Sequence, residues 1–217
     1  MEAFGDQEGG FRAREQIKLV PTLTVVAGPN GSGKSTLTRL GRQAFQHTPV
    51  LDPDAIGVSM QTVGVAGGSA IDAGRDVLRN AQELLSKNQS LVVETTLSGS
   101  TYLRMMARAK SQGYLLILLF VGTSDVSINM QRVRHRVLLG GHDVPEEDQI
   151  RRYPRSMENF RKAFALADEA SVFDNSSMQG HRIVAMKGTE GIELFEPVPE
   201  WAGFLRDAYS GTLTDPS

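Results

Sequence analysis

A glycine-rich octapeptide near the N-terminus constrains the fold more than any other feature of the chain. It consists of Gly28, Pro29, Asn30, Gly31, Ser32, Gly33, Lys34 and Ser35. These residues match the pattern G-x-x-x-x-G-K-[ST] in full. They follow an apolar run at 23–27, typical of a buried strand, and precede a helical pattern at 34–45. The glycines let main-chain N–H groups converge on an anion, and the start of a helix adds positive potential. The octapeptide therefore predicts a phosphate-binding loop between a strand and a helix.

Two side chains of this loop have predictable tasks. Lys34 is expected to reach the β- and γ-phosphates of a nucleoside triphosphate, and the Ser35 hydroxyl is expected to ligate Mg²⁺. With Thr36 included, residues 28–36 are the predicted binding site for ATP, with Mg²⁺ as its metal. A chance glycine-rich turn is the alternative, and the strand–loop–helix context argues against it.

Composition and length limit the number of domains and the classes of binding partner. The 217 residues suit one domain. The net charge of -2 argues against bulk attraction to nucleic acid or to a membrane surface. The chain has no cysteine, which excludes disulfides and fits a cytoplasmic location. The longest apolar run, 114–121, is too short to span a bilayer. We expect a flexible lead-in at 1–18, one domain at 19–210 and a flexible tail at 211–217.

Short apolar runs alternate with longer amphipathic stretches along the chain. The predicted strands are 23–27, 49–51, 91–93, 114–121, 170–173 and 182–186. The predicted helices are 34–45, 70–86, 101–112, 126–139 and 147–167, the last interrupted or started near Pro154, with a short helix around Trp201, Phe204 and Leu205. This alternation predicts an α/β fold in which helices cover both faces of a parallel sheet. Ligands of such sheets lie beyond the carboxyl ends of the strands, where the segments 28–35, 52–54 and 94–96 are expected to meet.

The octapeptide also occurs in ABC transporter ATPases, whose other motifs are missing here. The segment Leu97, Ser98, Gly99 and Ser100 lacks the second glycine and the glutamine of their L-S-G-G-Q signature. The strand predicted at 114–121 is followed by Gly122 and Thr123, not by an acidic pair. The sequence therefore disfavours an ABC ATPase.

The later motifs resemble the zeta-toxin family of P-loop kinases, in a branch often described as an ABC-type ATPase or kinase. The resemblance covers about residues 21–187 and rests on the segments 28–36, 52–54, 94–99, 140–145, 150–156 and 174–176. It implies a three-layer α/β/α P-loop kinase fold with a mostly parallel sheet and a helical lid at about 132–156. It further implies transfer of the ATP γ-phosphate to a small molecule, with the 3′-hydroxyl of UDP-N-acetylglucosamine as the first candidate, and an antitoxin protein as a partner. Pro53, between two aspartates, departs from the expected pattern.

Two acidic segments are candidates for the chemistry. Phosphoryl transfer needs a carboxylate that accepts the hydroxyl proton, and Asp54 is the predicted base because it matches the second-strand aspartate of the family. Asp52 would share this role or orient Mg²⁺. Glu94, Thr95 and Thr96 are predicted to bind the acceptor. The alternatives are helix capping by the aspartates and a solvated strand end at Glu94.

An arginine-rich stretch provides candidates for binding the transferring phosphoryl group. Arg132 and Arg136 are four residues apart and share one helix face, and Gly140 with Gly141 would form a hinge. Guanidinium groups suit the charge of a phosphoryl group. Arg136 and Arg152 are the preferred γ-phosphate ligands, and Arg132 and Arg155 are the second candidates. The alternatives are an ion-paired surface and a nucleic-acid patch.

Three further points stay open at this level. His142 is expected to be a structural hydrogen-bonding residue, although an acid–base role is the alternative. Asp174 and Asn175 either border the adenine or form a turn. Besides the nucleotide-sugar kinase, the sequence is compatible with a kinase of another sugar or metabolite, or with a regulatory P-loop ATPase that releases free phosphate.

Overall fold

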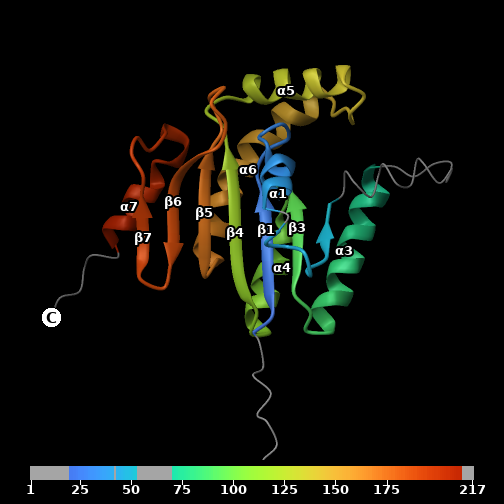
Figure 1. Ribbon diagram of the computed structural model, residues 1–217, viewed down its shortest axis with the longest axis vertical. Coiled ribbons are helices and arrows are strands. Elements are labelled where there is room, and N and C mark those ends of the chain that lie inside the picture. The colour runs from blue at the N-terminus through green and yellow to red at the C-terminus, as the bar shows by residue number, and fades with distance from the viewer. Residues whose placement is uncertain (1–19, 42, 53–69, 212–217) are drawn as a thin grey trace, which may run out of the picture.

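Seven strands form one sheet in the computed structural model, which describes residues 20–41, 43–52 and 70–211 (Figure 1). The strands are β1 (Thr22–Ala27), β2 (Val50–Leu51), β3 (Leu91–Thr95), β4 (Leu115–Gly122), β5 (Glu169–Asp174), β6 (Arg182–Gly188) and β7 (Gly191–Leu194). Their spatial order is β2-β3-β1-β4-β5-β6-β7. Strands β1 to β5 pair in parallel, and β6 and β7 are added antiparallel. The predicted α/β fold with a mostly parallel sheet is confirmed.

The helices connect the strands as the sequence pattern predicts. They are α1 (Lys34–Leu40), α3 (Ala70–Ser86), α4 (Ser100–Ser111), α5 (Val126–Leu138), α6 (Glu146–Leu166) and α7 (Phe204–Gly211), with a 3₁₀ turn η1 (Glu200–Ala202). Helices α4 and α6 lie behind the centre of the sheet in the view of Figure 1, and α5 crosses the end to which the parallel strands point. The predicted lid segment thus lies over the carboxyl edge of the sheet.

The central strands are buried on both sides, which explains their nearly continuous apolar sequences. Leu23 and Val25 of β1 belong to the main core together with residues of α3, α4 and α6, such as Ala81, Met106 and Phe160. Val26 points to the opposite face and is also fully buried. Burial on both faces fixes the ends of β1 and β3, from which the site is built.

Three elements differ from the sequence prediction. Helix α1 is shorter than expected because Gly41 caps it, donating its N–H to the Leu37 carbonyl at 2.9 Å. Helix α6 runs through Pro154 without interruption. Pro154 has no N–H to donate to the Ile150 carbonyl, but Ile150 is exposed to water. Strand β7 was not predicted, because its hairpin to β6 is very short, with Gly188 paired to Gly191.

The limits of the domain are only partly visible. The predicted lead-in at 1–18 lies outside the described residues, as does the predicted tail after 211. The short helix predicted around Phe204 and Leu205 is present as η1 and α7, with Leu205 fully buried in the core. Among the described residues, no helix has the length and apolarity needed to cross a membrane.

Candidate active site

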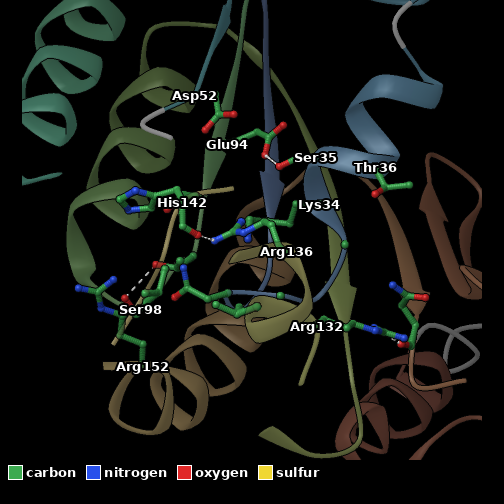
Figure 2. Close-up of a pocket in the computed structure, with 18 of the residues that line it drawn as sticks. Lys34, Ser35, Thr36, Asp52, Glu94, Ser98, Arg132, Arg136, His142 and Arg152 are labelled. Carbon is green, nitrogen blue, oxygen red and sulfur yellow. Dashed lines mark hydrogen bonds between the residues drawn. The ribbon is translucent and has the colours of Figure 1, made fainter. Parts of the chain in front are cut away.

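A cavity of about 780 Å³ opens at the carboxyl edge of the sheet (Figure 2). The phosphate-binding loop, the ends of β2 and β3, the helices α3 to α6 and the segment after β5 all contribute to its wall. Its lining includes most of the predicted site, namely Asn30, Gly31, Gly33, Lys34, Ser35, Thr36, Asp52, Glu94, Thr95, Thr96, Arg132, Arg136 and Arg152. Gly28, Pro29 and Ser32 are buried beneath this surface. Asp54 lies outside the described residues.

The loop between β1 and α1 has the backbone of a phosphate-binding loop. Gly31 and Gly33 have φ angles of 74° and 105°, in the left-handed region that favours glycine. At Gly31 a Cβ would lie 2.5 Å from the Asn129 carbonyl oxygen of α5, so only glycine fits there. The Lys34 Nζ donates to the Pro29 carbonyl at 3.0 Å, which folds this side chain back over the loop. The sequence motif therefore produces the expected local structure.

The Ser35 hydroxyl and the Glu94 carboxylate meet in the lining of the cavity. Ser35 Oγ donates to Glu94 Oε2 at 3.1 Å, as drawn in Figure 2. Glu94 is only 4% exposed. Magnesium in kinase sites is held by one or two protein oxygens together with phosphate oxygens and water, and these two side chains supply such oxygens. No group of three or more acidic or histidine side chains suited to a metal exists in the described part of the chain. The donor set thus fits a metal that is held largely by the nucleotide.

Asp52 lies on the wall on the same side of the view as Glu94 (Figure 2). Tyr102, at the start of α4, is its neighbour in the cavity. Burial, together with the Asp52 carboxylate, raises the pKa of the Tyr102 phenol to about 12. Tyr102 therefore stays neutral at physiological pH and can donate a hydrogen bond.

The hydroxyl groups at and after the end of β3 have two roles, because one stabilises a turn and the others face the cavity. Thr95 Oγ1 accepts the Leu97 N–H at 2.9 Å and so holds the turn after the strand. Leu97 has a φ of 55°, and its carbonyl accepts a hydrogen bond from Asn159 of α6 at 2.8 Å. The hydroxyls of Thr96 and Ser98 lie 3.0 Å apart and both residues line the cavity. Thr96 and Ser98 therefore present polar groups to a ligand, whereas Thr95 mainly supports the turn.

The four arginines predicted for the lid are placed differently. Arg136 lines the cavity and donates to the His142 carbonyl at 2.7 Å. Its side chain packs so closely on Gly141 that a Cβ there would lie 2.5 Å from Arg136 Cγ. Arg152 also lines the cavity and is held by Asp148 at 2.8 Å. These two side chains reach the cavity from different helices, α5 and α6.

The remaining two arginines have other surroundings. Arg132 reaches the cavity but donates to the carbonyls of Asn175 and Ser177, at 2.7 and 3.3 Å, in the segment after β5. Burial lowers the pKa of its guanidinium, and the Asp174 carboxylate opposes this shift. Arg155 is exposed on α6 and is not among the described residues that line the cavity. Its side chain could reach the cavity only after a rearrangement.

Several cavity residues were missed by sequence reasoning. They are Gly74, Arg75, Leu78, Ser98, Thr101, Tyr102, Val144, Ser177, Met178 and His181, of which only Ser98 and Val144 lie in segments that carry the family resemblance. The i, i+3 spacing places Arg75 and Leu78 next to each other on α3 and is the only local signal that could have indicated the pair. His142 also lines the cavity, and its main-chain carbonyl accepts the hydrogen bond from Arg136. The structural role predicted for its side chain stays a prediction.

Comparison with known proteins shows what this arrangement is similar to. A search of solved structures finds a complex of AvrRxo1-ORF1 and AvrRxo1-ORF2, with a TM-score of 0.67 and 16% identity over 90% of this chain and 66% of that chain. It also finds the PezAT chromosomal toxin–antitoxin system of Streptococcus pneumoniae, with a TM-score of 0.57 and 17% identity over 97% of this chain and 83% of that chain. A putative kinase of Chloroflexus aurantiacus has a TM-score of 0.50 and 21% identity over 63% of this chain and 80% of its own. These likenesses establish the fold. The chain thus spans just under two thirds of the AvrRxo1 chain.

Sequence comparison assigns the family. An uncharacterized protein of Haemophilus influenzae (strain ATCC 51907 / DSM 11121 / KW20 / Rd) is 34% identical over 126 residues, which are 58% of this chain and 88% of the relative. The family model described as zeta toxin matches residues 11–183, which is most of the chain and includes every predicted site residue. The chain therefore belongs to the zeta-toxin family.

Proposed function

We propose that this protein is an ATP-dependent kinase that transfers the γ-phosphate of Mg-ATP to a hydroxyl of a nucleotide sugar, with UDP-N-acetylglucosamine as the first candidate. The carrying observation is the single cavity that joins a phosphate-binding loop, through Lys34 and Ser35, to a wall with the carboxylates of Asp52 and Glu94. Family membership and the kinase-like fold support an ATP-dependent phosphotransferase. The identity of the acceptor rests on the resemblance alone.

Each group of residues has its own task in the proposed reaction. The loop amides and Lys34 bind the β- and γ-phosphates, and Arg136 and Arg152 stabilise negative charge on the transferring group. The acceptor oxygen attacks the γ-phosphorus while the bond to the bridging β–γ oxygen breaks, and ADP leaves. Asp54 accepts the proton of the acceptor hydroxyl. Thr96, Glu94 and Asp52 orient the acceptor.

Mg²⁺ would be held by Ser35 and the nucleotide, and it supplies charge neutralisation on the phosphate oxygens. Glu94 is close enough to Ser35 to bear on this position as well as on the acceptor. The Glu94→Gln variant distinguishes a role in metal binding from a role in acceptor binding. A change in acceptor KM alone indicates acceptor binding, whereas a raised Mg²⁺ requirement indicates a metal role.

The proposal is tested by product identification. The purified protein is incubated with labelled ATP and UDP-N-acetylglucosamine, and in parallel with a metabolite extract, and the phosphorylated product is identified by mass. A kinase forms phosphorylated product in amounts equal to ADP. Release of free phosphate without a phosphorylated product contradicts a kinase and points to a regulatory ATPase. Phosphorylation of a different metabolite refutes only the acceptor.

The Asp54→Asn variant tests the base. Loss of the base is expected to lower kcat on the order of 10²- to 10⁴-fold while ATP still binds. Rates and nucleotide affinity are measured together. Full turnover in this variant excludes Asp54 as the base.

We also propose an antitoxin protein as a partner. Two of the similar structures are described as complexes, AvrRxo1-ORF1 with AvrRxo1-ORF2 and the PezAT toxin–antitoxin system, which supports this idea by analogy. Expression of the chain alone and together with the product of the adjacent gene tests it. Growth arrest by the chain alone, relieved by the second protein, is the expected result.

A further inference from the structure

The phosphate-binding loop is held by two residues of the β5–β6 connection that also line the cavity. Asn175 Nδ2 donates to the Ser32 carbonyl at 2.7 Å. His181 Nε2 lies 3.1 Å from the Gly33 carbonyl oxygen. A carbonyl oxygen can only accept, so this contact requires the tautomer or charge state with hydrogen on Nε2. Both residues are far from the loop in sequence, and only Asn175 lies in a segment that carries the family resemblance.

These contacts fix the two peptide planes that matter for anion binding. In a planar trans peptide the C=O and the following N–H point in opposite directions. A Ser32 carbonyl held by Asn175 therefore turns the Gly33 N–H the other way. The Gly33 carbonyl accepts both the Leu37 N–H of α1 at 3.1 Å and the His181 ring, and these two contacts together turn the Lys34 N–H the other way. Both Gly33 and Lys34 line the cavity. Gly33 has no side chain that could compete for these amides.

The two donors are themselves held in place. Asn175 is 7% exposed; its N–H donates to the Gly122 carbonyl at 2.9 Å, and its carbonyl accepts Arg132 Nη1 at 2.7 Å. The His181 ring stands edge-on to Phe173, with ring centroids 6.3 Å apart. A Cβ at Gly33 would lie 2.5 Å from Asn175 Nδ2 and 2.9 Å from His181 Nε2, so glycine at this position makes room for the donors.

We propose that Asn175 and His181 are positioning residues that orient the Gly33 and Lys34 amides toward the phosphates of the nucleotide. This inference rests on the proposed function, since it assumes that the loop binds a triphosphate. On this proposal the two residues act through the main chain rather than through contact with the base or the ribose. Their effect is therefore on every ligand that carries the phosphate chain, with or without a nucleoside.

The test compares ATP with tripolyphosphate, which has the phosphates alone. Binding of each is measured calorimetrically with Mg²⁺ for the full chain and four variants, one of which is Asn175→Ala. His181→Phe keeps a ring against Phe173 but removes the donor, and His181→Gln keeps an N–H donor. Gln179→Ala changes an exposed residue of the same connection outside the cavity lining and serves as the matched control.

The expected result for His181→Phe is a loss on the order of 10-fold in affinity, similar for ATP and tripolyphosphate, from weakened amide–phosphate bonds. His181→Gln is expected to retain most of the parental affinity, and Gln179→Ala is expected to bind both ligands as tightly as the parent. Asn175→Ala is expected to act in the same direction, with a thermal unfolding midpoint recorded for each variant.

Two outcomes overturn the proposal. If His181→Phe weakens ATP but leaves tripolyphosphate unchanged, the side chain contacts the nucleoside instead. If neither ligand is affected in a folded His181→Phe variant, the imidazole does not orient the loop. Failure of the parent protein to bind either ligand is a different result, because it refutes the proposed function and the positioning role falls with it.

Discussion

The two ends of the cavity are built in different ways. At the phosphate end the ligand-facing groups belong largely to the main chain, and hydrogen bonds from other elements fix them, such as the Gly28 N–H to the Thr95 carbonyl at 3.2 Å and Asn175 to Ser32. At the end proposed for the acceptor the wall consists of side chains from separate elements, among them Asp52, Arg75 and Tyr102. A backbone nest is specified by a short motif, whereas a wall of side chains can change residue by residue. The comparison explains why the nucleotide is easier to infer than the acceptor.

The largest expected effect tests the phosphate end. Lys34→Ala removes the charge that the loop holds near the phosphates, and kcat is expected to fall on the order of 10²- to 10³-fold. Acceptor affinity is expected to stay unchanged, because the acceptor end does not depend on this side chain. Steady-state kinetics with both substrates measure the two effects separately.

Lys87→Ala is the matched control, since Lys87 is an exposed lysine paired with Glu83 at 2.6 Å. Parental rates are expected in this variant. A Lys34→Ala protein that retains kcat within a factor of about three contradicts transition-state stabilisation by this lysine.

The next effect concerns the boundary between the two ends. Arg152→Ala removes a guanidinium that reaches the cavity from α6, and a loss of about 10²-fold in kcat is expected. Arg151→Ala is the control. Arg151 also pairs with Asp148, but it is exposed and lies outside the cavity lining of the described chain. Rates of the two variants are compared with that of Arg155→Ala. A larger loss in Arg155→Ala than in Arg152→Ala would reveal a rearranged, closed form of the helices over the cavity.

A smaller effect is expected at the acceptor end. Arg75 lines the cavity and, with the proposed nucleotide-sugar acceptor, would supply a positive charge to its diphosphate, so Arg75→Ala is expected to raise the acceptor KM about 10-fold. The KM for ATP and kcat are expected to stay near parental values. Arg79→Ala, one helical turn further along α3 and paired with Asp76, controls for the loss of charge. A raised KM for ATP instead would place Arg75 at the phosphate end and weaken the comparison.

The smallest effect at neutral pH is expected for Tyr102→Phe, and it becomes visible only in alkali. The pKa of Tyr102 is raised from its ordinary value to about 12. The folded state thus holds the phenol proton more tightly than the unfolded state does. The resulting stabilisation is complete below the unfolded pKa of about 10 and is lost as the pH rises toward 12. Thermal unfolding between pH 9 and 11.5 is expected to show a shallower pH dependence in Tyr102→Phe, and an unchanged dependence would contradict burial of this phenol.

The sequence predicted the elements with strong local signals. The glycine-rich octapeptide, the run at 114–121 and the amphipathic helix at 70–86 have periodicities or a motif that tertiary contacts did not override. That the segments 28–35 and 94–96 meet at one edge followed from topology, since parallel neighbours end at the same edge, whereas the Ser35–Glu94 hydrogen bond was not predicted. Helix α6 was harder, because the cost of Pro154 is outweighed by packing of Phe160 and Phe164 in the core, which no local pattern reveals.

The rest of the site could not be predicted from local patterns. Asn175 and His181 approach the loop only because β5 lies next to β4, so their contacts depend on the assembled sheet. The contacts of the arginines in the 132–156 segment could not be predicted for the same reason. Spacing places Arg132 and Arg136 on one helix face, but the partners that separate them, Asn175 in one case and His142 in the other, come from other segments.

The chain contains one tryptophan, Trp201, and its indole ring lies directly on Gly122 at the end of β4. Its Nε1 is 3.3 Å from Asp174 Oδ1, one residue before Asn175. Intrinsic fluorescence therefore originates from a single fluorophore next to the segment that bears the loop-orienting amide. The emission spectrum offers a label-free signal for nucleotide titrations and stopped-flow measurements, in which no second indole contributes background.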